Sequence, residues 1–407
     1  MPRQRPCTPA LVLFAAVALV PLPAAPACWA AAPTKYAIDM AAFFQEVEKT
    51  YPFFDLKGIR KDWEAAKRHV AAKVGSCQSD SEFLGLVVEA MKVLRDAHMT
   101  LEDPKAEIPR PPTEYCPGIS FLPGIQNTVL VMYAPKGLEA QLKTGTLVVS
   151  IDGKPARAVL DEQARRAWAG GGFFSSPQRA ALFEYRIPLR GKQGEKHVIG
   201  YLDGRRPKQV TLTSTREAGG WPHTYNLPKD LKQVGRSFWY TRLASGAGYM
   251  YIRRVDDSTT PGIKEALEKV PAARGWVADL SGNAGGGYGE TLIEAIKAMP
   301  RPVAVVIDAG CISAGETLAR DFVRYAGAKL FGSTTAGSST SKKHWTFPSG
   351  IASVRISERT RGGIDGKPIE FHGIEPHLKV EAVPQEVAAG FNSAILRAEQ
   401  YLQTQKR

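Results

Sequence analysis

The 407-residue sequence is poor in cysteine, and it lacks any spacing of histidine, cysteine and acidic residues that is typical of a metal site. Its five cysteines are Cys7, Cys28, Cys77, Cys116 and Cys311. If the protein is exported, Cys77 and Cys116 are the plausible disulfide pair, because both flank predicted elements outside the core. Cys311 is expected to be a packed small apolar residue rather than a second nucleophile. No metal ion or other cofactor is therefore expected.

The sequence has no apolar run that is long enough to span a bilayer. The longest one, Leu11–Leu22, follows two arginines and precedes a series of small residues. This pattern is typical of a secretory signal peptide, assigned to residues 1–30, so the mature protein is expected to be periplasmic or secreted. Cleavage after Ala27 would leave Cys28 first, as in a lipoprotein, but Ala25 stands where such proteins usually have Leu. A lipid anchor at Cys28 is therefore the less favoured interpretation.

The sequence also lacks long runs of one charge, although its formal net charge is +13. Lysines and arginines are dispersed and gather only in pairs such as Lys342-Lys343 and Arg205-Arg206. A dispersed excess favours solubility through self-repulsion over binding to nucleic acid. Charged residues make up 23% and apolar residues 44%, which is the composition of an ordinary globular protein. The length predicts two or three domains.

The segment Gly275–Glu316 alternates apolar strands, glycine-rich turns and helices. The predicted strands Trp276–Leu280 and Pro302–Ile307 each lead into a glycine turn and then into a helical pattern. A strand that ends in such a turn at a helix start leaves backbone N–H groups pointing outward, where they suit a developing anion. The second turn places Ser313 at such a site. A serine beside unpaired N–H donors is what acyl transfer needs.

Five segments, in order, resemble motifs of the carboxyl-terminal processing (tail-specific) and tricorn-type serine peptidases. Leu94-Arg95-Asp96-Ala97-His98 is similar to their Leu-x-Asp-x-His, and Asp279–Gly286 to their Asp-Leu-Arg-Gly-Asn-x-Gly-Gly turn. Ser313-Ala314-Gly315-Glu316 is similar to the nucleophile motif Ser-Ala-x-Glu. Gly332–Gly337 resembles Gly-Glu-x-Thr-x-Gly, and Glu370–Pro376 resembles the closing Glu-Gly-x-Gly-Ile-x-Pro. The resemblance implies an α/β chain whose core is a crotonase-like (ClpP/crotonase) spiral.

The resemblance also implies the residues of a serine peptidase site. Ser313 would be the nucleophile, His98 its general base, and Glu370 the acid that orients the imidazole. The oxyanion would be held by backbone N–H groups, those of Ala314 and of Gly285 or Gly286. The implied partner is a polypeptide substrate, with no cofactor.

The sequence departs from the family at two positions. Ser338 stands where the tail-specific branch has its base, a Lys. Ala97 stands where the tricorn branch has a Ser just before its His. A direct contact between His98 and Glu370, or Asp96 as the orienting group, would have to replace that Ser.

Three alternatives follow from these departures. Lys342, expected on a surface loop, could be the base of a Ser/Lys peptidase if it is desolvated. The missing Lys and Ser would also fit a non-catalytic ligand- or peptide-binding protein on the same fold. Ser313 could be an N-cap serine on the helix that follows it.

The remaining sequence predicts three regions after the signal peptide. Residues 31–108 are expected to be helical, and residues 217–407 to form the catalytic core. Residues 109–216 are expected to form a PDZ-like β domain, with an insertion at Asp161–Arg190 that resembles a loop or lid. Gly137–Pro155 is similar to the PDZ signature, and such domains bind a chain terminus by adding it as a strand. The whole predicts an exported serine endopeptidase that acts through an acyl-enzyme on unfolded or C-terminally tagged polypeptides.

Overall fold

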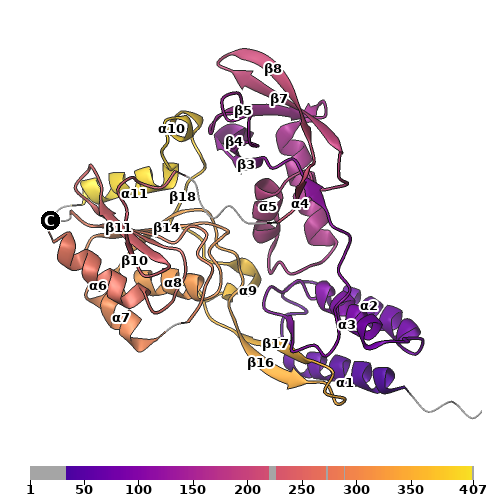
Figure 1. The fold of residues 1–407 in the computed structure, drawn as a ribbon. Helices are drawn as coiled ribbons and strands as arrows, with labels where there is room; N and C mark the ends of the chain where they lie inside the picture. The colour runs from indigo at the N-terminus through magenta and orange to yellow at the C-terminus, as the bar shows by residue number, and fades with distance from the viewer. Residues whose placement is uncertain (1–33, 220–225, 272–273, 288, 406–407) are drawn as a thin grey trace, which may run out of the picture.

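The computed structural model describes residues 34–219, 226–271, 274–287 and 289–405. The predicted signal peptide, with Cys7 and Cys28, lies outside these residues. Within the described part, no helix is both long and apolar enough to cross a membrane. Figure 1 shows a helical region at the N-terminus, a β domain after it, and a larger α/β core that ends the chain.

The N-terminal region consists of the three helices that the sequence predicts: α1 (Lys35–Thr50), α2 (Arg60–Val74) and α3 (Asp80–Val93). Side-chain caps from Thr34 and Ser79 begin α1 and α3, since each hydroxyl accepts a hydrogen bond from an N–H of the first turn. The apolar faces of the helices share one buried cluster, which includes Phe43, Trp63 and Phe83. Burial of these large aromatic side chains stabilises the region.

A hairpin of the core completes this cluster. It consists of β16 (Thr340–Thr346) and β17 (Ser353–Thr360), and it forms a sheet of order β1-β17-β16 with β1 (Thr100–Glu102). Its side chains Phe347, Val354 and Ile356 are buried among those of the helices. The helical region and the core are therefore packed together and joined by a shared sheet.

The β domain has a six-stranded antiparallel sheet in which the main order is β3-β4-β5-β7-β8, with β6 on β5. Its strands are β3 (Ser120–Pro123), β4 (Val129–Tyr133), β5 (Leu147–Ile151), β6 (Lys154–Pro155), β7 (Lys196–Asp203) and β8 (Arg206–Thr213). A two-stranded sheet pairs β2 (Tyr115–Cys116) with β9 (Arg216–Glu217), and a short 3-10 helix, η1, covers Ile125–Asn127.

The insertion of this domain is mainly helical and not the loop that the sequence suggests. Most of it lies in two helices, α4 (Ala156–Ala169) and α5 (Pro177–Arg186). Ser176 caps α5 with its side chain and Pro177 stands at the first turn, which is a strong helix start. The glycine run that suggested a loop is only the connection between the two helices.

The predicted disulfide between Cys77 and Cys116 is wrong, since both cysteines are free. Cys77 packs against the cluster of the helical region, whereas Cys116 is buried on β2 of the β domain. The two thiols thus belong to different regions of the fold. Cys311 is fully buried, and burial raises the pKa of its thiol, as expected of a packed and unreactive cysteine.

The core is a seven-stranded sheet of order β10-β11-β12-β13-β14-β15-β18, parallel from β12 onward. Its strands are β10 (Lys232–Val234), β11 (Phe238–Arg242), β12 (Gly248–Ile252), β13 (Trp276–Asp279), β14 (Val303–Ile307), β15 (Lys329–Gly332) and β18 (Leu378–Lys379). Its helices are α6 (Thr259–Lys269), α7 (Glu290–Lys297), α8 (Ala314–Ala326), α9 (Ile369–His372), α10 (Pro384–Ala388) and α11 (Ser393–Thr404).

Helices cover both faces of this sheet. Side chains of α6, α7 and α8 share the larger buried cluster on one face, and α11 packs on the other (Figure 1). The strands β13 and β14 are buried along their whole length, which explains their continuous apolar sequence. Because these strands are parallel neighbours, the turns that follow them meet at one edge of the sheet, and Ser313 lies at the end of the second turn.

Candidate active site

Ser313 is held in a strained backbone conformation at the start of α8. Its φ of 59° is positive, which is rare for a residue with a side chain. Its N–H donates to the carbonyl oxygen of Ser338 at 2.8 Å and to the Glu316 carboxylate at 3.1 Å. These two bonds fix the turn, so the structure around Ser313 maintains a conformation that the residue alone would avoid.

Glu316 joins the two turns on which Ser313 and Ser338 lie. Its buried carboxylate accepts hydrogen bonds from the N–H groups of Ser313, Gly337 (2.8 Å) and Ser338 (2.9 Å), and from Thr335 Oγ1 (2.6 Å). Burial raises the pKa of Glu316 to about 7, and these four bonds oppose the rise. The glutamate of the Ser-Ala-x-Glu motif therefore has a structural task beside the serine.

His98 lies between Ser313 and Ser338. Its Nε2 is 3.1 Å from Ser313 Oγ, and its Nδ1 is 3.0 Å from Ser338 Oγ. Its backbone N–H donates to Asp96 Oδ1 at 2.8 Å, which fixes the segment after α3. Burial, and then the positive charge of Lys342, lower the pKa of His98 to about 4, while Asp96 opposes this change. The imidazole is therefore neutral at pH 7 and able to accept a proton.

Glu370 does not reach His98 through any hydrogen bond of the described residues. Its Oε1 lies instead 2.7 Å from Lys57 Nζ, and that ammonium also lies 3.7 Å from Asp96 Oδ2. All three side chains are closed off from solvent. Burial, and then the charge of Asp96, raise the pKa of Glu370, while Lys57 and Ser175 oppose the rise. One ammonium group thus lies between two buried carboxyl groups beside the histidine segment.

Three residues at this site are absent from the set that the motifs suggested. Ser338 occupies the place of the family's Lys, so the position was visible in the sequence but its contact with His98 was not. Lys57 follows the first helix and has no motif of its own. Ser175 comes from the connection between α4 and α5, and its hydroxyl accepts a hydrogen bond from the N–H of Ala97 at 3.2 Å. The hydroxyls of Ser338 and Ser175 thus contact His98 and the residue before it, which is itself an alanine.

The glycine turn of residues 285 and 286 lies directly against Ser313. A Cβ at Gly285 would stand 2.8 Å from Ser313 Cβ, and its φ is 71°, so only glycine fits. The N–H of Gly285 donates to Asn283 Oδ1 at 2.9 Å. The N–H groups of Gly286 and Ala314 have no hydrogen-bond partner within the part of the chain that the structure describes. Of the two predicted glycine donors, Gly286 is therefore the one that remains available to an oxyanion.

Lys342 is not on a surface loop, as the sequence suggested, but on strand β16. Its side chain is half-buried, and burial followed by the charge of Arg355 lowers its pKa. Ser313 Oγ has its hydrogen bond with His98 Nε2, and no bond between Ser313 and Lys342 occurs among the described residues. The geometry therefore favours His98 over Lys342 as the proton acceptor.

The β domain reaches the site through the start of α5. Ser176 Oγ donates to the carbonyl oxygen of Ala336 at 2.6 Å, and Gln178 Nε2 donates to those of Thr335 and His372, both at 3.2 Å. Arg179 donates to the carbonyl oxygen of Ala309 at 3.1 Å. The backbone turns that carry Ser313, Ser338 and Glu370 are thus braced by one helix start.

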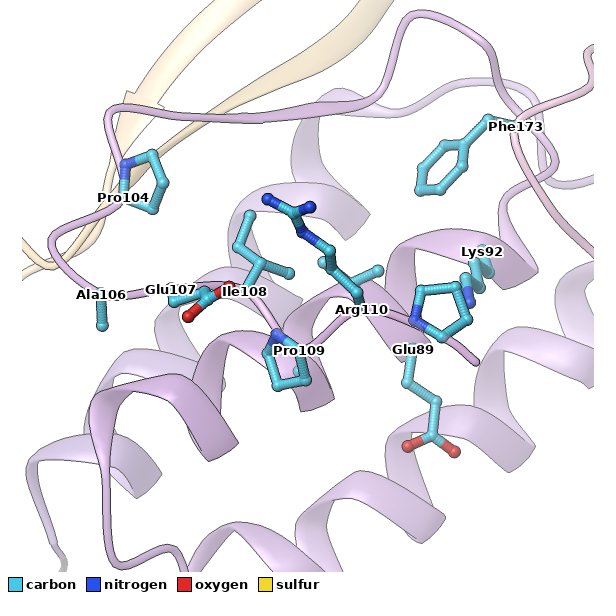
Figure 2. A pocket seen from close by; sticks show the side chains of 12 residues that line it. Glu89, Lys92, Pro104, Ala106, Glu107, Ile108, Pro109, Arg110 and Phe173 are labelled. Carbon is cyan, nitrogen blue, oxygen red and sulfur yellow. The ribbon is translucent and has the colours of Figure 1, made fainter. Parts of the chain in front are cut away.

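The connection between α4 and α5 also borders a cavity away from Ser313. This cavity, of about 880 Å³, lies between α3 and the proline-rich segment 104–111, and Figure 2 shows Phe173 at its margin. Phe173 is two positions before Ser175, so the connection contacts the helical region and the histidine segment together. No group of three or more His, Cys, Asp or Glu in the described ranges could hold a metal ion.

Comparison with known proteins finds a family model that matches part of the chain. Residues 290–380 match the model of Peptidase family S41. The structure of mature CPAF resembles the chain with a TM-score of 0.60 at 11% identity, over 91% of this chain and 95% of that one. A putative peptidase from Parabacteroides merdae resembles it with a TM-score of 0.51 at 13% identity, over 92% and 98%.

At these identities the structural likeness shows the fold alone, and it confirms the predicted mixed α/β architecture. No curated protein sequence matches the chain. The family match covers the segment that contains Ser313, Ser338 and Glu370. Over residues 290–380 the chain thus resembles peptidase family S41, and this match supports a serine-type peptidase.

Proposed function

We propose that the protein is an exported serine endopeptidase that cleaves polypeptides through an acyl-enzyme formed on Ser313. The observation that carries this proposal is the 3.1 Å contact between Ser313 Oγ and His98 Nε2, two residues that are 215 positions apart in the sequence. A nucleophile within hydrogen-bond reach of a neutral base is the arrangement that this chemistry requires. A strained backbone at Ser313 is further support, because such strain is concentrated at functional sites.

His98 would begin the reaction in the tautomer whose Nδ1–H donates to Ser338 Oγ, which leaves Nε2 free to accept. Nε2 then takes the proton of Ser313 while Oγ attacks the carbonyl carbon of the substrate. Ser338 would hold the imidazole in this tautomer and orientation, the role that a carboxylate has in the better-known triads. Asp96 would stabilise the imidazolium through its charge, since that charge favours the protonated form of His98.

The negative charge that develops on the carbonyl oxygen would be held by the N–H groups of Gly286 and Ala314. Each such donor typically contributes about 3 kcal/mol to stabilisation of the transition state. When the tetrahedral intermediate collapses, the C–N bond breaks and His98 returns the proton to the leaving amine. A water molecule then attacks the acyl-enzyme and passes a proton to His98. The ester C–O bond breaks, His98 returns the proton to Ser313 Oγ, and the second product leaves with its new carboxyl group.

Glu370 would act on His98 indirectly, through Lys57. Its pairing with Lys57, which also lies near Asp96, holds the segment from which His98 projects. This role differs from the direct His98–Glu370 contact considered from the sequence. It is a positioning role rather than a catalytic one.

The proposal also covers the type of core, the role of the β domain and export. The core would be the crotonase-like spiral of the family, and the β domain a PDZ-like module that recruits a substrate's C-terminus. Support for a link between that domain and catalysis comes from α5, whose first residues bind the backbone turns of the site. Export rests on the signal-peptide pattern in residues 1–30.

Fluorophosphonate labelling of the mature protein, followed by location of the modified peptide by mass spectrometry, tests the proposal. The reagent needs an activated serine and no knowledge of the substrate. We expect an adduct on Ser313 in the wild type and a loss of labelling in His98→Ala. An adduct that persists in His98→Ala and disappears in Lys342→Met would assign the base to Lys342 instead. A complete absence of labelling, together with an absence of proteolysis, would favour a binding protein on the same fold.

A further inference from the structure

The small sheet of β1, β17 and β16 begins at the candidate catalytic residues on both of its edges. β1 starts two residues after His98, and β16 starts two residues after Ser338. The central strand β17 pairs with both, with Thr100 opposite Arg355 and Lys342 opposite Ser357. Side chains near these strand starts therefore lie beside the candidate site.

One face of this sheet packs on the N-terminal helices. Lys343 Nζ lies 2.5 Å from Glu46 of α1, and Trp345 and Ile356 contact the apolar cluster of the helices. Because side chains alternate along a strand, the neighbours of Lys343 and Trp345 on β16 point to the opposite face. The two adjacent lysines, Lys342 and Lys343, are therefore on different sides of the sheet.

The opposite face carries an excess of positive charge. Its cationic residues are Lys342 and Arg355, with His344 as a third group that can be charged. Its single carboxylate, Glu102, is already bound to Arg355 and lies 3.0 Å from His344 Nδ1. This carboxylate is thus not available to Lys342.

Lys342 is the unsatisfied group on this face. No ion pair or hydrogen bond of its ammonium occurs within the described ranges, although its side chain is half-buried. The charges of Arg355 and Arg361 disfavour its positive charge, while the charge of Asp96 favours it. Partial burial of an unpaired ammonium is unfavourable unless a negative group comes to it. Lys342 is four residues after Ser338, whose hydroxyl lies 3.0 Å from His98 Nδ1, and its positive charge lowers the pKa of His98.

We propose that Lys342 binds a carboxylate of the polypeptide substrate beside the bond that Ser313 cleaves, and so makes the enzyme selective for acidic chains or acidic chain ends. This inference rests on the proposed function and adds a substrate class to it. The carboxylate can belong to an Asp or Glu side chain or to the C-terminus of the substrate. Both present the same charged oxygens to an ammonium group.

The deciding experiment measures peptide binding to the Ser313→Ala variant, which cannot form an acyl-enzyme. Short labelled peptides of one neutral scaffold carry Glu or Gln at single positions, and each is made with a free and with an amidated C-terminus. Fluorescence anisotropy gives the Kd of each peptide. We expect the best carboxylate-bearing peptide to bind about tenfold more tightly than its neutral counterpart, as a hydrogen bond between charged groups implies.

Addition of Lys342→Met to Ser313→Ala should abolish that difference, whereas Lys342→Arg should keep most of it. Lys343→Met is the matched control, because this lysine is on the same strand and faces the helices. It should preserve the preference. A preference for the free over the amidated C-terminus assigns the carboxylate to the chain end, and one for Glu over Gln assigns it to a side chain. Equal binding of acidic and neutral peptides, or a preference that persists in Lys342→Met, overturns the proposal.

Cleavage of the same peptides by the wild-type enzyme separates this inference from the proposed function. Cleavage without preference for the acidic peptides would leave the peptidase in place and reject the carboxylate site. Selective binding without cleavage by the wild type would retain the carboxylate site and reject the proposed peptidase chemistry. Circular dichroism of each variant checks that the hairpin β16–β17 still folds.

Discussion

Lys57 Nζ lies 2.7 Å from Oε1 of Glu370, and neither side chain is exposed to solvent. The two residues come from distant parts of the chain, the first after α1 and the second at α9. Lys57 also donates to the carbonyl oxygen of Arg95 at 2.7 Å, three residues before His98. The pair therefore connects the helical region, the histidine segment and the end of the core in one buried contact.

Lys57→Met should destabilise the protein by about 3 to 5 kcal/mol, because it leaves the carboxyl groups of Glu370 and Asp96 buried without their cation. The pKa of Glu370 should rise further, since Lys57 is one of the groups that oppose its rise. Urea denaturation followed by fluorescence measures the free energy of unfolding. Activity should fall as well, because the segment that carries His98 loses the bond at Arg95.

The double variant Lys57→Met/Glu370→Gln should recover part of the lost stability, because it removes one of the two carboxyl groups that are left without their cation. Lys297→Met is a suitable control, since its ion pair with Glu294 is on the surface. It should leave the free energy of unfolding unchanged within error. If Lys57→Met were as stable as this control, the buried pair would have no role in holding the site.

His98 should set the acid limb of the pH profile near pH 4 rather than near pH 6.5. Its pKa is lowered to about 4, mainly by burial, so the neutral form that accepts the proton persists well below neutrality. The ratio kcat/KM, measured from pH 3 to 8 on a peptide without titratable groups, reports the free enzyme. A half-point between pH 6 and 7 would show that His98 is more hydrated than in this structure, and a rise only at alkaline pH would indicate a lysine base.

Lys342→Met should move that acid limb to higher pH. The positive charge of Lys342 disfavours the imidazolium form of His98, so its removal raises the pKa of His98. The enzyme would then lose activity at a higher pH on acidification than the wild type does. The matched variant Lys343→Met, whose side chain faces α1, should leave the limb in place. Equal shifts in the two variants would indicate a general effect of net charge.

The strands and turns that carry Ser313 could be predicted from the sequence because local signals agree there. The strands β13 and β14 are continuous apolar runs, and each is followed by a glycine-rich turn that leads into a helix. The strand, turn and helix signals therefore agree. Ser313 and His98 could be proposed together only through the family motifs. Their contact depends on the packing of the N-terminal helices against the core, which no local pattern encodes.

The sequence predictions were wrong where contacts between residues far apart in the chain determine the local structure. Lys342 lies on a strand because β16 pairs with β17, although its local sequence resembles a polar loop. The run around Gly171 suggested that the insertion is a loop, but Ser176 and Pro177 begin a helix directly after it. The contacts of Ser175 with the histidine segment could not be foreseen, since a serine in such a connection has no signature.

The hydroxyl of Ser338 offers the most direct test of how His98 is positioned. Ser338→Ala removes the hydroxyl that lies 3.0 Å from Nδ1 of His98. Ser338 is fully buried, so solvent does not reach its position in the structure. The ring then loses the bond that fixes its tautomer, and we expect kcat to fall roughly 10- to 100-fold with little change in KM, as the loss of one buried hydrogen bond implies. Ser338→Thr retains a hydroxyl and should keep most of the activity, and Ser341→Ala, on the exposed part of β16, should have none of these effects. A normal kcat in Ser338→Ala would mean that Asp96 alone orients the histidine through its backbone N–H.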